Sequence, residues 1–125
     1  MGVVSDLGEP APLDATLLRA RAVVLHDIAA RGADTADIVD VVDACVAQRR
    51  WWVEQWPDGA AFVAGQVAQD VQDRLVDTEG RWPTCPDHAD EALQLDPPLG
   101  EAPQWVCERG CGAVAPLGAL PPVAT

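Results

Sequence analysis

The stretch TADIVDVVDACVAQRRWWVEQWPDG, residues 35–59, contains an amphipathic helix together with its start and stop signals. Its apolar side chains recur every three or four residues, which is the spacing of one helix face. They are Ile38, Val41, Val42, Cys45, Val46, Trp52, Val53 and Trp56. Thr35 or Asp34 stands where an N-cap is needed, and Pro57-Asp58-Gly59 ends the pattern. The sequence therefore predicts a helix over residues 36–55.

Similar patterns on both sides predict two further helices. Residues 13–31 carry an apolar stripe, and Gly32 follows as a C-cap. The stripe consists of Leu13, Leu17, Val24 and Ile28, widened by Leu18 and Leu25, with Asp14 as N-cap or first-turn acid. Residues 59–79 carry a face of small side chains, which is closed by Gly80. Because the connections are short, neighbouring helices should run antiparallel. Residues 13–80 are thus expected to form a three-helix bundle.

The composition of the sequence changes after residue 80. Prolines and glycines punctuate residues 81–121, and short apolar runs remain between them. These runs, at 93–95, 105–107 and 113–117, predict two or three short strands. The expected fold class is α+β, a helical bundle followed by a small C-terminal module with short antiparallel strands. Residues 1–12 and 122–125 are expected to be tails.

Three of the four cysteines and one of the two histidines fall within this module. The first pattern is C-P-x-H, from Cys85 to His88. The second is C-x3-C-G, in which the two cysteines are Cys107 and Cys111. Two ligands from each of two tight turns are typical of a structural Zn²⁺ site. Gly110 and Gly112 would permit unusual backbone angles in the second turn. Because four ligands complete the tetrahedron, a structural zinc is favoured over a catalytic one, and a disulfide or chance clustering are the alternatives.

The quoted residues resemble a zinc ribbon. More loosely, RWPTCPDH, WVC and CGAVAPLGAL together resemble the C-terminal tails of small uncharacterised actinobacterial and actinophage proteins. The resemblance covers residues 81–120 and implies nothing about the helices. It departs from the commonest ribbon pattern at one place, because three residues rather than two separate Cys107 from Cys111.

Composition restricts the function classes. The chain has 125 residues and a formal net charge of −12, which argues against a main task of binding nucleic acid or anionic membrane. All eight cationic side chains are Arg, and Lys, Asn and Tyr are missing, which favours a high-GC bacterium or its phage as the source. No secretory signal or long apolar run is visible, so a cytoplasmic protein is expected, or a virion component if a phage encodes it.

Other residues with chemical potential have plainer interpretations. Cys45 lies in the apolar arc and is expected to be an inert core thiol, and His26 is a poor catalytic partner on a polar face. Asp34, Asp37, Asp40 and Asp43, like Asp70, Asp73 and Asp77, recur every third or fourth residue. Such acids spiral around a helix instead of converging on one cation, so they predict a solvated face. Arg21 and Arg49 interrupt apolar arcs, as edge side chains or as partners of a buried Asp.

The functional hypothesis is a non-enzymatic protein–protein interaction module, an adaptor or assembly protein in which Zn²⁺ stabilises the fold. Trp51, with Arg49 and Arg50, is the candidate partner-binding surface, although Trp51 could instead pack beneath the metal module. Three alternatives remain: a phage virion structural or accessory protein, an acidic mimic that inhibits a nucleic-acid-binding protein, and an enzyme that uses Cys45 or the zinc. The expected partner is a protein, with neither nucleic acid nor membrane involved.

Overall fold

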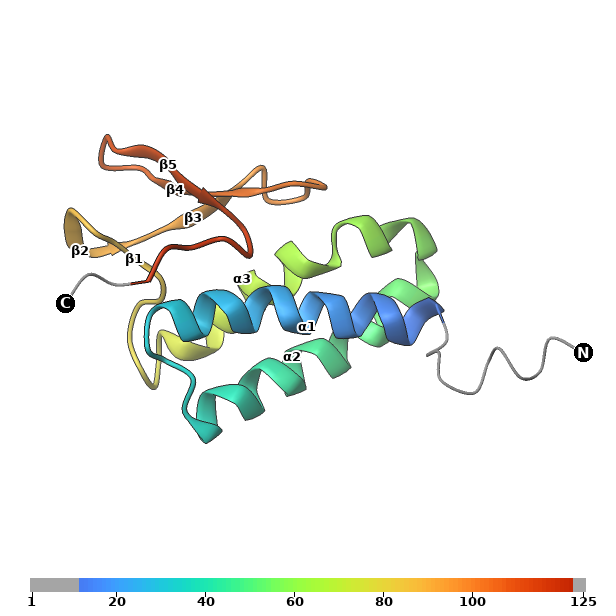
Figure 1. Cartoon of the computed structure of the whole chain (residues 1–125). Coiled ribbons are helices and arrows are strands. Elements are labelled where there is room, and N and C mark those ends of the chain that lie inside the picture. The colour runs from blue at the N-terminus through green and yellow to red at the C-terminus, as the bar shows by residue number, and fades with distance from the viewer. Residues whose placement is uncertain (1–11, 123–125) are drawn as a thin grey trace, which may run out of the picture.

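A computed structural model describes residues 12–122 and confirms the α+β class. Three α-helices come first: α1 (Pro12–Ala30), α2 (Ala36–Gln55) and α3 (Val63–Leu75), with the 3₁₀ helix η2 (Pro57–Ala61) before α3. Five short strands follow: β1 (Thr84–Cys85), β2 (His88–Ala92), β3 (Gln94–Asp96), β4 (Gln104–Cys107) and β5 (Gly112–Pro116). Figure 1 shows the strands gathered on one side of the helices. In the described range no helix is long and apolar enough to cross a membrane.

The signals around α2 act as predicted, and its bounds are those expected from the sequence. The Thr35 side chain accepts a hydrogen bond from the backbone N–H of Ile38 at 3.3 Å and caps the helix. The exposed fraction of Ile38, Val42, Cys45 and Val53 is 5% or less, so this part of the apolar arc faces the core. Trp56, predicted in the same arc, is 39% exposed.

Three details of the predicted helices are wrong. The third helix begins at Val63, not at residue 59, because Pro57 starts a separate 3₁₀ turn whose Gly59 lies under the rings of Trp52 and Trp56. The helix also ends at Leu75, whose carbonyl accepts the N–H of Gly80 at 2.8 Å in a closing turn. The predicted stripe of the first helix is too wide, since Leu18 is 56% exposed.

The strands form two antiparallel sheets. β1 pairs with β2 in a two-stranded ribbon, and β3, β4 and β5 form a three-stranded sheet in that order. In the larger sheet Trp105 lies opposite Leu95 on one side and Ala115 on the other. All three side chains are buried, so one face of this sheet contributes to the core.

One hydrophobic core extends through both halves of the chain. Buried side chains of the helices, such as Val24 and Val71, belong to the same cluster as Trp82, Leu93 and Trp105 of the strand region. The side-chain amide of Gln72 on α3 adds hydrogen bonds to the carbonyls of Trp82 and Leu93, at 3.2 and 2.8 Å. The boundary at residue 80 stays a prediction, but these contacts lead us to expect that the two parts unfold together.

Candidate metal centre

The first pair of candidate ligands lies on the β1–β2 hairpin. Cys85 is the last residue of β1, and His88 is the first residue of β2 directly opposite it. Only Pro86 and Asp87 separate them, so the turn brings the thiol and the imidazole together. Cys85 is buried and His88 is half-buried. Sγ of Cys85 lies 3.6 Å from Nδ1 of His88.

The second pair lies on the β4–β5 hairpin. Cys107 ends β4, and Cys111 immediately precedes β5. The tight reversal between them uses Gly110 at φ +113° and Gly112 at φ +72°, backbone angles that L side chains rarely adopt. The expectation that these glycines permit the second turn is therefore confirmed.

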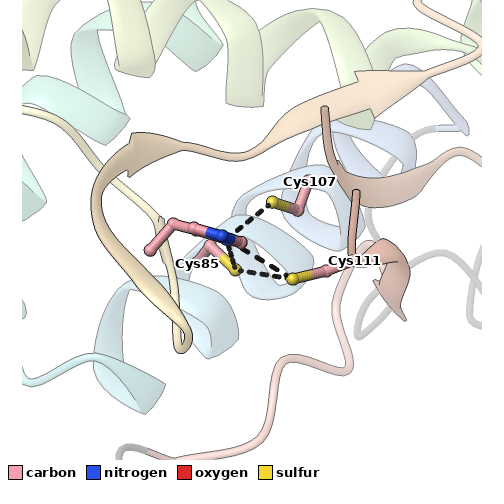
Figure 2. Close-up of side chains that lie close together, drawn as sticks. Cys85, Cys107 and Cys111 are labelled. Carbon is pink, nitrogen blue, oxygen red and sulfur yellow. Dashed lines mark hydrogen bonds between the residues drawn. The ribbon is translucent and has the colours of Figure 1, made fainter. Parts of the chain in front are cut away.

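The two hairpins bring the four side chains together, as Figure 2 shows for the labelled cysteines. Nδ1 of His88 lies 3.5 Å from Sγ of both Cys107 and Cys111, and Sγ of Cys85 lies 3.6 Å from Sγ of Cys111. A tetrahedral Zn²⁺ with ordinary bond lengths would separate two sulfurs by about 3.8 Å and a sulfur from a nitrogen by about 3.5 Å. The four groups therefore have the spacing of ligands around one metal ion.

The cysteines are free thiols. The sulfurs of Cys85 and Cys111 are well beyond the roughly 2.05 Å of a disulfide bond. Burial opposes ionisation of Cys107, but hydrogen bonds from the backbone N–H groups of Cys111 and Arg109 outweigh it and lower the pKa of that thiol to about 7. A hydrogen bond with Cys85, together with burial, raises the pKa of Cys111 to about 12. A cation would have to displace this proton, so metal binding and deprotonation are coupled.

Comparison with models of protein families finds a match for this chain. The model for the family "Domain of unknown function (DUF8819)" matches residues 13–117. The chain belongs to this family. The match includes the three helices as well as all four candidate ligands. No curated protein and no solved structure matches the chain.

The remaining acidic and thiol candidates of the DUF8819 domain lie apart from this centre. Asp34, Asp37, Asp40 and Asp43 are all exposed, as expected of a solvated face. Cys45 is fully buried, and burial raises the pKa of its thiol. Nδ1 of His26 lies 2.8 Å from Oδ1 of Asp27, so this imidazole is bound to a carboxylate and not to Cys45. Among the residues described, the cluster of Cys85, His88, Cys107 and Cys111 is the one group with metal-ligand spacing.

The candidate partner-binding residues divide between two grooves. Arg49 and Trp51 line one between α2 and α3, whereas Arg50 lines one between α1 and α2. Trp51 is 65% exposed, so the alternative that it packs beneath the metal module is wrong. Arg49 donates two hydrogen bonds to Asp70, at 2.6 and 2.9 Å, and its guanidinium lies over Trp52. Arg50 pairs with Asp14, and Arg21 pairs with Asp43.

Two residues connect the helices to the metal hairpins and were missed in the sequence: Asp27 on α1, and Arg31 in the turn that follows α1. The carboxylate of Asp27, which is fully buried, accepts hydrogen bonds from Trp105 Nε1 and from the backbone N–H groups of Gly118 and Leu120, at 2.8, 2.7 and 3.0 Å. Arg31 donates from Nη1 to the carbonyl of Thr84 at 2.9 Å. Both looked like ordinary polar positions, because their partners lie 53 to 93 residues away along the chain.

Proposed function

We propose that this DUF8819 protein is a non-enzymatic protein–protein interaction module, in which Cys85, His88, Cys107 and Cys111 hold a structural Zn²⁺. Three thiolates and one imidazole are a donor set that suits zinc, and their spacing fits a closed tetrahedron. Two of the four ligands are buried and are carried by short hairpins with little core of their own. Such a module gains its stability from the metal, which is the usual role of a closed zinc site.

The observation that carries the interaction role is the exposure of Trp51. A tryptophan that is 65% exposed leaves a large apolar surface in water, and tryptophan is among the residues that most often anchor protein interfaces. The groove beside it has a volume of about 350 Å³ and is lined by Gln48, Arg49, Trp52, Asp70, Asp73 and Arg74. Since the chain carries a net charge of −12, the partner we propose is a protein with a basic surface.

Native mass spectrometry of the protein purified from its own host tests both halves of this proposal. We expect one zinc per chain and a stoichiometric protein partner, and we expect Trp51→Ala to lose the partner while keeping the zinc. Leu99→Ala, an exposed apolar side chain outside this groove, is the matched control and should retain both. A Trp51→Ala protein that keeps its partner would refute the proposed surface.

Two alternative functions, a virion structural role and an acidic mimic of nucleic acid, are compatible with the same fold. Native mass spectrometry also distinguishes these two. A symmetric assembly of many copies would favour the first. A basic nucleic-acid-binding protein, released as salt is raised, would favour the second.

A further inference from the structure

We propose that Asp27 and Arg31 are positioning residues for the metal centre: the last turn of α1 and the residue directly after it hold both hairpins in the register that metal binding requires. This inference rests on the proposed Zn²⁺ site. Asp27 lies in the last turn of α1, and Arg31 directly follows the last helical residue, Ala30. Each of them contacts a different half of the candidate centre.

Asp27 fixes the second hairpin. Its Oδ2 accepts from Trp105 Nε1, and Trp105 precedes the ligand Cys107 by two residues on the same short strand, β4. The same carboxylate accepts from the backbone N–H groups of Gly118 and Leu120, which follow β5. The carboxylate thus holds the chain on both sides of the turn that carries Cys107 and Cys111.

Arg31 fixes the first hairpin. Its Nη1 donates to the carbonyl of Thr84, the residue immediately before the ligand Cys85. Within residues 12–122 Arg31 forms no ion pair, whereas four of the eight arginines pair with carboxylates. Its Nε and Nη2 are also buried without a hydrogen-bond partner.

The charge of the metal centre supplies a reason for this unpaired guanidinium. Three thiolates and one Zn²⁺ would have a net charge of −1, and a guanidinium beside the Cys85 turn would attract that anion. Residues outside the ligand set that orient it typically contribute ten- to a hundredfold to metal affinity. Arg31 would act both through the Thr84 carbonyl and through its charge.

The test compares Arg31→Met with Arg19→Met, an exposed arginine on α1, in the full-length protein. Zinc affinity is measured by competition with a chromophoric chelator, and the d–d absorption of the Co²⁺-substituted protein reports the ligand geometry. We expect Arg31→Met to weaken zinc binding at least tenfold and Arg19→Met to leave it unchanged. Arg31→Lys, which keeps the charge, should restore part of the affinity.

A merely structural role is separated by the stabilisation that zinc confers. If Arg31→Met only weakened the fold, the zinc-free and zinc-bound proteins would lose equal stability, and the rise in the denaturation midpoint on adding Zn²⁺ would stay at the wild-type value. We expect that rise to shrink, since stabilisation by a ligand falls with its affinity. Wild-type zinc affinity in Arg31→Met would overturn the inference alone, whereas failure of the wild-type protein to bind zinc would overturn the proposed metal site as well.

Discussion

Asp27 is the residue on which the two halves of the molecule depend most. A carboxylate without access to water is costly to bury unless hydrogen bonds replace its hydration. Asp27 receives them from the neighbouring His26 side chain and from three groups near the C-terminal end of the chain. This one side chain therefore connects α1 to three groups in and after the larger sheet.

Replacing Asp27 by Asn should destabilise the whole protein. The amide can accept at only one atom, so at least one buried N–H among Trp105, Gly118 and Leu120 loses its acceptor. We expect a loss of about 2–3 kcal/mol in the free energy of unfolding, measured by denaturant titration. Helical circular dichroism and tryptophan fluorescence should change in one transition. Asp40→Asn, on the exposed face of α2, should cost less than about 0.5 kcal/mol, and an equal loss in both variants would contradict this account.

The thiols should fall into two reactivity classes. With zinc bound, we expect no thiol to react rapidly with a chromogenic disulfide reagent. A strong chelator should then free the three thiols of Cys85, Cys107 and Cys111, and Cys107, whose pKa is lowered to about 7, should react first. Cys45 should remain slow until the protein unfolds, because it is fully buried and burial raises the pKa of its thiol. A Cys45→Ala variant should give the same three, and a fourth fast thiol in the wild-type protein would show that the core opens.

The candidate ligands could be predicted from the sequence and Asp27 could not, for a physical reason. Ligands that share a turn are close in the sequence, so the spacing of Cys85 and His88, or of Cys107 and Cys111, is visible in the letters themselves. The partners of Asp27 lie 78 to 93 residues away. Only the fold shows that this acid points inward, while Leu18, an apolar residue of the same helix, points into water.

At the scale of elements, prediction succeeds where local signals suffice. The cap of α2 and the apolar arc of its side chains lie within a few residues of each other, and the helix has its predicted bounds. The β1–β2 ribbon was not among the predicted strands, because β1 has two residues and the HADEA sequence of β2 shows no apolar alternation. The two strands pair around the turn that carries Cys85 and His88. Tertiary contacts therefore specify this two-stranded sheet more than the β propensity of its residues does.

The β4–β5 turn offers a test of how backbone shape supports the centre. Gly110 has φ +113°, and a Cβ added there would meet nothing within 4 Å. Gly110→Ala should therefore act through backbone strain alone, costing about 1–3 kcal/mol. We expect it to weaken zinc binding measured by chelator competition. The comparison variant Gly65→Ala lies in α3 with an ordinary φ and should leave zinc affinity unchanged; equal affinities in both variants would contradict the role of this turn.

The whole molecule is strongly acidic, and half of its arginines form ion pairs with its own carboxylates. Arg21, Arg49, Arg50 and Arg109 all contact carboxylates, which leaves few guanidinium groups for phosphates. We therefore expect no change in fluorescence anisotropy of labelled duplex DNA or single-stranded RNA at about 10 µM protein in about 150 mM salt. Binding that weakens steeply as salt is raised would show that the remaining arginines form one basic face.

The metal content of the purified protein shows whether a metal ion completes this fold. The protein should be purified from its host without chelator, and its intact mass should be measured under native conditions alongside elemental analysis. We predict one zinc per chain, lost in a Cys107→Ser, Cys111→Ser double variant and retained in Cys45→Ala. Wild-type protein that is folded but carries no stoichiometric metal, or zinc that persists in the double variant, would contradict the account.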